Sequence, residues 1–472
     1  MVKLRLLGVN DFHGHLEPPA PNLGGAAWLT AHLDAATLPG RTIRVHAGDM
    51  VGASPLISSW FHDEPSIEAA NAMGFDVGTL GNHEFDEGLR ELLRLLHGGQ
   101  RTGPEALKRD AGGELVNTSS PSFAGARFPY VSANAYTRDG KLVLPPYAVV
   151  QRAGVRVGFI GVTTTSTPKF LVARYAEQLR FTDISEAVNR WVPALRRRGV
   201  EAIVVLAHEG APSQDSEGQG GPPTGRIVRE AAQMSDEVDV VVAGHSHSRL
   251  DLRLPNRGRS GDKLIVEAGS YGTAYDRVDL TIDRSTGEVV AKSAAVRATR
   301  HSGVSPDART AALVSRYRRR IAPLAEHRVG STAGALTRAN GRLGQLVADA
   351  QRASAGTDVA LVNSGSLRGD IAAGPITFGA LFEAQPYDHR LMRLELSGRA
   401  LNRILERGGA HVFLAGARPP LDPSRRYSVA VNELFAKAVA LSAGRGGPVP
   451  MAGTEVGAAR EAVQRRGGGP GS

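Results

Sequence analysis

The stretch VDVVVAGHSH at residues 238–247 decides the fold, because an apolar run ends abruptly there in a polar turn rich in histidine. A second stretch of the same kind, AIVVLAHEG, lies at 202–210. Runs that are apolar at consecutive positions predict strands buried on both faces, which is typical of sheets covered by helices on both sides. The two stretches therefore predict a layered α/β domain.

Outward from these stretches, short apolar runs alternate with helix-like segments through residues 1–300. Strands are expected at 3–9, 42–47, 76–80, 155–161, 202–207, 238–243 and 264–268. Helices are expected near 24–35, 65–73, 87–97, 185–198 and 225–235. The stretches 98–128 and 211–224 are rich in Gly, Pro or Ser, which predicts surface loops that pack no core.

The rest of the chain predicts a second, smaller domain. Residues 306–326 have the pattern of a helix with a basic face, which Pro323 is expected to end or kink. We therefore expect a first domain over 1–300, a helical linker over 301–327 and an α+β domain over 328–460. The Gly-rich end predicts a flexible tail over 461–472.

Composition excludes several classes of protein. With 42% hydrophobic and 22% charged residues, the 472-residue chain is neither disordered nor fibrous. The absence of Cys excludes disulfides, Cys-ligated zinc and thiol catalysis. The net charge of +9 is spread along the chain, which argues against a dedicated nucleic-acid groove.

The sequence gives no sign of a membrane segment. No run of about 18 apolar residues occurs, so no membrane span is expected. The start, MVKLRLLGVNDFHGH, lacks the long apolar core of a signal peptide. The chain is therefore expected to be cytoplasmic as written, or to have lost a leader, and its oligomeric state is left open.

Polar residues of a few types follow nearly every predicted strand, and the carboxyl ends of such strands meet at one edge of an open α/β sheet. They are Asp11, His13, Asp49, Asn82, His83, Asp86, His208, His245 and His247. Carboxylate, amide and imidazole donors suit divalent Zn, Mn, Fe or Co. In Asp-x-His and His-x-His pairs, one intervening residue lets both side chains point to one side of an irregular turn. The sequence therefore predicts a metal site.

Five motifs carry a resemblance to a known family: DFHGHLEP at 11–18, GDMVGASP at 48–55, GNHEFDEG at 81–88, AHEG at 207–210 and GHSH at 244–247. They resemble the calcineurin-like metallophosphoesterases, above all the bacterial 5′-nucleotidase branch, which includes UDP-sugar hydrolases and 2′,3′-cyclic-nucleotide phosphodiesterases. The resemblance implies a β-sandwich flanked by helices and a C-terminal substrate domain. It also implies two divalent metal ions, one held by Asp11, His13, Asp49 and His247, the other by Asp49, Asn82, His208 and His245.

The same resemblance makes His83 the catalytic histidine, which would hydrogen-bond a phosphoryl oxygen or the leaving group. Asp86 would orient its ring and keep it cationic, because a nearby carboxylate raises a histidine pKa. The alternative is that Asp86 caps a helix that begins near Glu87. Glu84 and Glu87 are expected to be solvated, and His15 is expected to be solvated or to support a metal ligand. Asn134 is expected either to contact substrate or to have a structural role. Ser270 and Tyr271 are given no role in the chemistry.

Residues 328–440 resemble the C-terminal substrate domain of the same family through TRANGRLGQLVADAQ at 337–351, NSGSLRGDI at 363–371 and the segment at 376–398. The resemblance implies that Arg368 and Arg338 grip substrate oxygens, that Asn363 hydrogen-bonds base or sugar, and that Tyr387 stacks on the base. A surface ion pair for Arg338 and a packed aromatic ring for Tyr387 are the alternatives. The turn GRGGPVP at 444–450 lacks the family's Asp and aromatic residue, so the base clamp is expected to be open or one-sided.

The expected function is a 5′-nucleotidase that releases phosphate from nucleoside monophosphates, with a small-molecule nucleotide as its partner. Enzymes that act on cyclic nucleotides, nucleotide-sugar diphosphates or general phosphomonoesters are the first alternative. A non-catalytic, metal-dependent module that binds anions or nucleic acid is the second.

Overall fold

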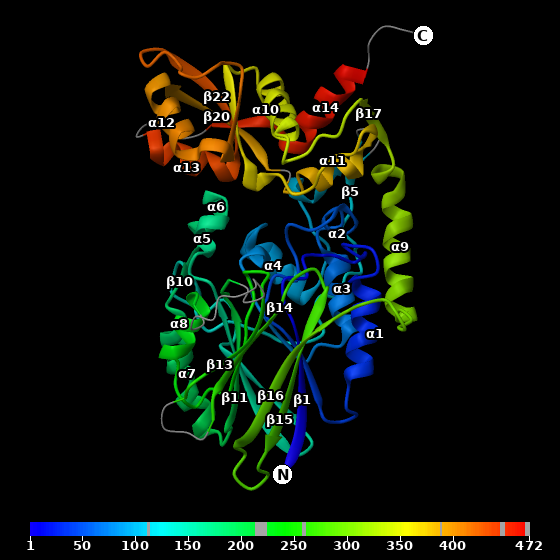
Figure 1. Cartoon of the computed structure of the whole chain (residues 1–472), viewed down its shortest axis with the longest axis vertical. Coiled ribbons are helices and arrows are strands. Elements are labelled where there is room, and N and C mark those ends of the chain that lie inside the picture. Colours follow the sequence, from blue (N-terminus) through cyan, green and yellow to red (C-terminus); the bar gives the residue numbers. More distant parts are fainter. Residues whose placement is uncertain (111–113, 213–223, 257–260, 388, 444–448, 468–472) are drawn as a thin grey trace. The chain divides into compact units, whose positions relative to one another are not determined.

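In the computed structural model, the chain forms two compact units, Met1–Lys108 with Val116–Arg318, and Arg109–Leu115 with Arg319–Ser472 (Figure 1). The structure describes residues 1–110, 114–212, 224–256, 261–387, 389–443 and 449–467. The long helix α9 (Ala308–Ala325) contains the division between the two units. Its Pro323 lies in the last turn, and the helix ends two residues later.

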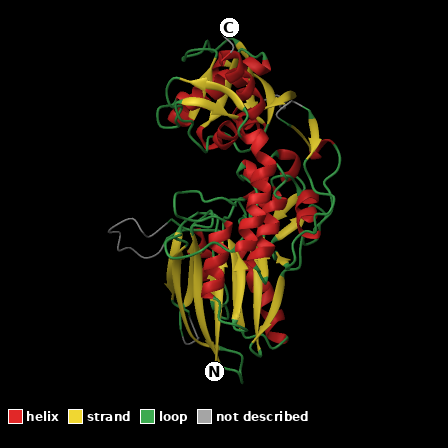
Figure 2. Ribbon diagram, turned by 90° about the vertical axis from the view of Figure 1, so that its right-hand side faces the viewer, coloured by secondary structure: helices red, strands yellow, loops and turns green. Residues whose placement is uncertain are grey.

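The first unit contains two six-stranded sheets, which Figure 2 shows as two sets of strands. The order in the first sheet is β16 (Val289–Ala298), β15 (Ala274–Ile282), β1 (Val2–Val9), β2 (Thr42–His46), β3 (Val77–Thr79) and β6 (Tyr130–Val131). The order in the second is β13 (Arg249–Leu254), β14 (Lys263–Ala268), β12 (Val240–Val242), β11 (Ala202–His208), β9 (Val155–Thr163) and β8 (Tyr147–Arg152). A small pair joins β7 (Ala135–Thr137) to β10 (Leu179–Phe181).

The two sheets pack face to face, so the expectation of helices on both faces is wrong for the second sheet. Leu6 and Val45 of the first sheet share a core with Val204 and Val242 of the second. Helices cover the other face of the second sheet, where α7 (Ile184–Arg197) and α8 (Arg226–Gln233) pack on β11 and its neighbours. An apolar run shows that both faces of a strand are buried, but it does not show whether a helix or a sheet buries each face. The β-sandwich implied by the resemblance is the arrangement found.

The remaining helices of the first unit border the sandwich and its loops. They are α1 (Ala26–Ala36), α2 (Leu56–Ser59), α3 (Glu64–Met73), η1 (His83–Phe85), α4 (Leu89–His97), α5 (Thr167–Phe170) and α6 (Ala173–Ala176). Strands β1, β2 and β3 are parallel to one another, as are β9, β11, β12 and β14. The carboxyl ends of the strands within each sheet therefore meet at one edge.

The segment 98–128, which was predicted to be a surface loop, forms regular elements and is attached to the rest of the unit by hydrogen bonds. It contains η2 (Pro104–Ala106), β4 (Leu107–Arg109) and β5 (Leu115–Asn117). The buried carboxylate of Glu64 on α3 accepts hydrogen bonds from Ser119 Oγ at 2.6 Å and Ser120 N at 2.9 Å. These polar contacts add to apolar burial in the segment, where Phe123 packs with Val51, Ile67 and Leu95. Residues 213–223 of the other predicted loop lie outside the described residues.

The second unit has a five-stranded sheet in the order β21 (Val412–Ala415), β18 (Val359–Asn363), β22 (Arg426–Asn432), β20 (Arg390–Ser397) and β23 (Val449–Thr454). A separate pair joins β17 (Arg328–Thr332) to β19 (Gly374–Thr377). The helical segments are α10 (Arg342–Ala355), η3 (Ser364–Ser366), α11 (Phe378–Ala384), α12 (Gly398–Gly408), η4 (Gly409–His411), α13 (Glu433–Ala443) and α14 (Glu455–Gly467).

The expected flexible tail is wrong for residues 461–467, because α14 continues to Gly467. Ala462 and Val463 are buried, and α14 packs on α10 and β17. The prediction of a tail rested on the Gly-rich end of the sequence and did not consider the apolar residues of the helix just before it. Residues 468–472 lie outside the described residues.

Candidate metal centre

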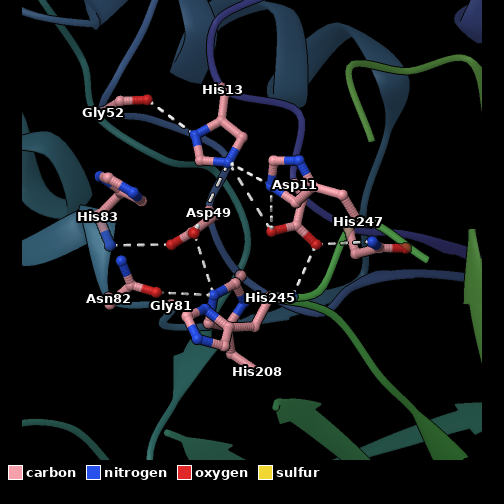
Figure 3. A network of polar contacts seen from close by, with 12 residues as sticks. Asp11, His13, Asp49, Gly52, Gly81, Asn82, His83, His208, His245 and His247 are labelled. Atoms are coloured by element: carbon pink, nitrogen blue, oxygen red, sulfur yellow. Dashed lines mark hydrogen bonds and ion pairs between the residues drawn. The ribbon is translucent and has the colours of Figure 1, made fainter. Parts of the chain in front are cut away.

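The structure brings together all seven residues predicted from the sequence as metal ligands, at the carboxyl ends of strands and in the loops that follow them (Figure 3). The first group is Asp11, His13 and His247, whose ligand atoms lie within 4.8 Å of one another. His247 Nε2 lies 3.4 Å from Asp11 Oδ1 and 3.2 Å from His13 Nε2. Residues more than 230 positions apart in the chain thus share one small space.

The second group is Asp49, His208 and His245, again with ligand atoms within 4.8 Å of one another. His208 Nε2 lies 3.0 Å from Asp49 Oδ2 and 3.2 Å from Asn82 Oδ1. Asp49 Oδ2 is also 3.7 Å from His13 Nε2 in the first group. Asp49 is therefore the residue that lies between the two groups.

The backbone at this site is unusual, because five of the seven residues have left-handed φ angles. The values are 49° at Asp11, 48° at His13, 49° at Asp49, 73° at His245 and 56° at His247. Side-chain-bearing residues adopt this region rarely, and such strain concentrates at functional sites. The left-handed turns place alternate residues of the Asp-x-His and His-x-His pairs in one cluster.

Backbone carbonyls orient two of the imidazoles. His13 Nδ1 donates to the carbonyl oxygen of Gly52 at 2.9 Å, and His208 Nδ1 donates to that of Ala47 at 2.8 Å. A carbonyl can only accept, so Nδ1 carries the proton and Nε2 of each ring faces the centre. Histidine ligands of metals are commonly fixed in this way.

The electrostatics of the buried carboxylates fit bound cations. Burial opposes ionisation, but the surrounding imidazoles hold the pKa of both Asp11 and Asp49 below the ordinary value. Asp11 Oδ1 is buried and has no hydrogen-bond partner among the described residues. Burial opposes charge on His208, yet Asp49 raises the pKa of His208 to about 10, so a cation that binds here competes with a proton. Anionic oxygens and inward-facing imidazole nitrogens together form a donor set for divalent metals.

His83 and Asp86 form a close pair beside this cluster. His83 Nδ1 lies 2.6 Å from Asp86 Oδ2, and His83 N donates to Asp49 Oδ1 at 2.9 Å. Burial opposes protonation of the ring, but the Asp86 carboxylate and then that of Asp49 raise the pKa of His83 to about 9. Helix α4 begins after Gly88, its N-cap residue, so the alternative that Asp86 caps this helix finds no support.

The expectation that Glu84 is solvated is wrong. Glu84 is only 4% exposed, and its carboxylate accepts from three backbone amides: Asp49 N at 2.9 Å, Met50 N at 2.8 Å and Gly81 N at 2.5 Å. Burial and then the Asp49 charge raise the pKa of Glu84 to about 7. Glu84 therefore joins the loops that carry Asp49 and Asn82. By contrast, the Glu87 side chain is 44% exposed and forms an ion pair with Arg101.

Asn10 is a second supporting residue that the sequence analysis missed. Its Nδ2 donates to Asp11 Oδ2 at 2.7 Å and to the Gly269 carbonyl at 2.6 Å. Its Oδ1 accepts from Ala268 N at 2.8 Å, which ties the loop after β1 to the end of β14. The sequence offered one weak signal, a polar residue directly before Asp11 at the end of an apolar strand.

Three other polar residues of the sequence analysis have defined places. Asn134 is fully buried and bonds the backbone of Thr163 and Thr182, which makes it structural. The His15 ring lies 4.0 Å from that of Tyr271, which also lies 5.3 Å from the ring of His247. Tyr271 has a φ of 59° and its amide donates to the Asp11 carbonyl at 2.7 Å, so it packs against the candidate centre.

In the second unit, the structure brings together two of the four expected substrate residues. Arg368 donates from Nε at 3.0 Å and from Nη2 at 2.5 Å to the hydroxyl of Tyr387. Asn363 Oδ1 is buried and unpaired within the described part of the chain, whereas Arg338 Nε lies 3.2 Å from Asp370 Oδ1. Residues 444–448 of the altered turn lie outside the described residues.

Comparison with known families agrees with the fold and the centre. The model "Calcineurin-like phosphoesterase" matches residues 4–249, more than half of the chain, and "5′-nucleotidase, C-terminal domain" matches residues 325–418. The chain belongs to the calcineurin-like phosphoesterase family, within its 5′-nucleotidase branch.

Two curated relatives that this chain matches are longer than the chain itself. Endonuclease YhcR of Bacillus subtilis is 35% identical over 430 residues, which cover 87% of this chain and 33% of that protein. Cell wall protein Lmo0130 of Listeria monocytogenes is 33% identical over 450 residues, which cover 84% of this chain and 55% of that protein. The chain thus spans between a third and just over half of the length of these relatives.

Among solved structures, a 5′-nucleotidase precursor from Thermus thermophilus is similar, with a TM-score of 0.75 and 25% identity over 99% of this chain and 97% of that chain. Through the described ranges, no helix is long and apolar enough to cross a membrane.

Proposed function

We propose that this protein hydrolyses nucleoside 5′-monophosphates to a nucleoside and inorganic phosphate, with two divalent cations as cofactors. The observation that carries the proposal is the cluster of seven ligand residues beside the His83–Asp86 pair. The second matching family model and the similar Thermus 5′-nucleotidase favour a nucleotide over other phosphoesters.

In this proposal, Asp11, His13, Asp49 and His247 hold one cation, and Asp49, Asn82, His208 and His245 hold the other. The position of Asp49 between the two groups supports its role as the shared ligand. Cations held in this way supply Lewis acidity toward phosphoryl oxygens and toward water. Zn, Mn, Fe and Co all suit the donor types.

The protein's own residues would guide the proton and the leaving group. The oxygen of a water molecule forms a bond to phosphorus while the ester P–O bond breaks, and one water proton passes to solvent. The cationic ring of His83 would donate a proton to the leaving oxygen as the P–O bond breaks, and the ring would then regain a proton from solvent. Asp86, 2.6 Å from Nδ1, holds the ring in orientation and stabilises its charge.

In the second unit, we propose that Arg368 and Tyr387 bind the nucleoside part, with Asn363 as a hydrogen-bond acceptor for base or sugar. The buried, unpaired Oδ1 of Asn363 supports this role, because a buried acceptor without a partner is costly. Arg338 is a weaker candidate for substrate contact, because Asp370 already pairs with it.

A phosphate-release panel tests the proposal. Purified protein is stripped with a chelator, reloaded with Mn²⁺, Zn²⁺ or Co²⁺, and assayed on AMP, UMP and p-nitrophenyl phosphate. We expect turnover of the nucleotides, abolished by Asp49→Asn because this change removes the shared charge. The absence of turnover with every divalent ion would reject the proposal.

A broader phosphoesterase is the second candidate, favoured by the sequence of the altered turn at 444–450. The panel therefore also includes 2′,3′-cyclic AMP, a UDP-sugar and, because one relative is named an endonuclease, single- and double-stranded DNA. Equal rates on AMP and on esters without a base would favour this second candidate. Hydrolysis of DNA alone would contradict both.

A further inference from the structure

Phe170 is an exposed aromatic residue beside the candidate metal centre. It ends the short helix α5 (Thr167–Phe170), and it is 41% exposed. The chain enters this helix from the end of β9, where Thr163 pairs in register with His208. The strand order of the sheet therefore delivers Phe170 to the edge that carries the ligands.

The Phe170 ring contacts one of the candidate ligands directly. Its centroid lies 5.5 Å from that of His245, with an interplanar angle of 69°. The His245 ring in turn lies 5.2 Å from that of His208. The apolar, solvent-facing ring of Phe170 thus contacts the second ligand group through His245, whose ring also lies beside that of His208.

Hydrogen bonds hold the segment before Phe170 against the site. Thr164 N donates to the His208 carbonyl at 2.8 Å, and Thr164 Oγ1 donates to Glu209 Oε2 at 2.8 Å. Thr167 Oγ1 donates to the Thr164 carbonyl at 2.7 Å. Arg226 also lies 3.2 Å from Glu209 Oε2, and it donates to the hydroxyls of Thr165 and Ser166. These hydrogen bonds therefore hold the segment that carries Phe170 in place, which lowers the conformational entropy lost when a ligand binds.

Single exposed apolar side chains are common and need no function. In the described residues, however, the other large hydrophobic side chains of high exposure are Met1, Leu107, Leu115 and Val290, none of which is aromatic. The cations and charged side chains of the centre suit the phosphoryl group. A planar organic group attached to that phosphoryl group gains binding energy by stacking on an aromatic ring beside the centre.

We propose that Phe170 determines specificity by stacking on, or packing against, the planar organic group of the ester. The inference rests on the proposed function and assigns to one residue the preference for a leaving group that carries a nucleobase or another aromatic ring. Base–aromatic stacking is tolerant of base identity, because every base has a π face. Phe170 would therefore select planar over aliphatic esters without choosing among bases.

The test measures kcat/KM for AMP and for glycerol 2-phosphate with holoenzyme variants. We expect Phe170→Ala to lower the ratio of the two values about tenfold, which lies within the range for removing one stacking partner. Phe170→Trp should preserve the ratio, because it retains a π face. Val290→Ala serves as the matched control, since Val290 is 46% exposed on β16 and should leave both values unchanged.

Metal content is measured on each variant, because Phe170 touches His245. A ratio within about twofold of the wild type would overturn the inference, as would an equal loss on both esters. Adenosine binding, followed by equilibrium dialysis, gives a readout independent of turnover and should weaken about tenfold in Phe170→Ala. If the wild type hydrolysed neither ester, the proposed function would fail, while unchanged adenosine binding in Phe170→Ala would separately overturn the role of Phe170.

Discussion

Replacing Glu84 by Gln should weaken both metal binding and folding, because this carboxylate joins the two loops that carry Asp49 and Asn82. Its Oε2 accepts from Asp49 N at 2.9 Å and Gly81 N at 2.5 Å, while Oε1 accepts from Met50 N at 2.8 Å. A Gln side chain has one carbonyl oxygen, which can replace Oε2 and keep two of these bonds. Its NH₂ group then faces the Met50 amide, and one buried donor loses its acceptor.

A buried polar group without a partner costs about 1–3 kcal/mol, which is a substantial part of a typical folding free energy of about 5–15 kcal/mol. Displacement of the Asp49 loop should also weaken metal affinity by about 10–100-fold, the range for residues that orient metal ligands. Thermal unfolding and competition with a chelator measure the two effects. Exposed Glu177 provides the matched control, and Glu177→Gln should change stability by less than about 0.5 kcal/mol. A Glu84→Gln variant with the metal affinity and Tm of the wild type would contradict this role of Glu84.

Two further predictions concern pH. Asp86 is the strongest of the groups that raise the pKa of His83 to about 9, so activity that needs the cationic ring should fall as pH rises through that value. In Asp86→Asn, the alkaline limb of the pH–rate profile should move down by roughly 1–3 units, and an unmoved limb would argue against the pair. Asp276 is fully buried, and neither carboxylate oxygen has a hydrogen-bond partner in the described chain, so burial raises its pKa well above the ordinary value. A raised folded-state pKa gives stability below about pH 3.9 that is lost as pH rises toward that folded value. Over this range, the urea midpoint of the wild type should therefore decline relative to that of Asp276→Asn; an identical pH dependence in the two proteins would contradict the assignment.

The ligand cluster could be predicted because its members follow apolar strands, and strand ends are a feature of the one-dimensional pattern. The left-handed backbone at Asp11, His13 and Asp49 could not be predicted in the same way. Asp and His do not favour this conformation as Gly does, and the surrounding fold has to impose it. The role of Glu84 was also hidden, because its partners are backbone amides, which every residue except proline possesses.

The same limit explains the errors in the fold. The run AIVVLA indicates that both faces of β11 are buried. The same apolar residues would be expected whether a helix or a second sheet covers a given face. At the C-terminal end, the composition of GGGPGS favoured the prediction of a flexible tail that also included the apolar residues just before it. One of these residues, Val463, is buried in the second unit. Burial depends on what a residue meets in space, and a local window contains little of that information.

We assign a pair of divalent cations to the seven ligand residues, and the metal content of the purified protein is a direct test of this assignment. The protein is stripped, equilibrated with Zn²⁺ or Mn²⁺ and freed of unbound ions, and its metal is measured by elemental analysis. We expect two ions per chain in the wild type and fewer than two in Asp49→Asn, in which the shared ligand loses its charge. A wild type that retains no ion, or an Asp49→Asn variant that retains both ions with unchanged affinity, would contradict the assignment of two cations to these residues.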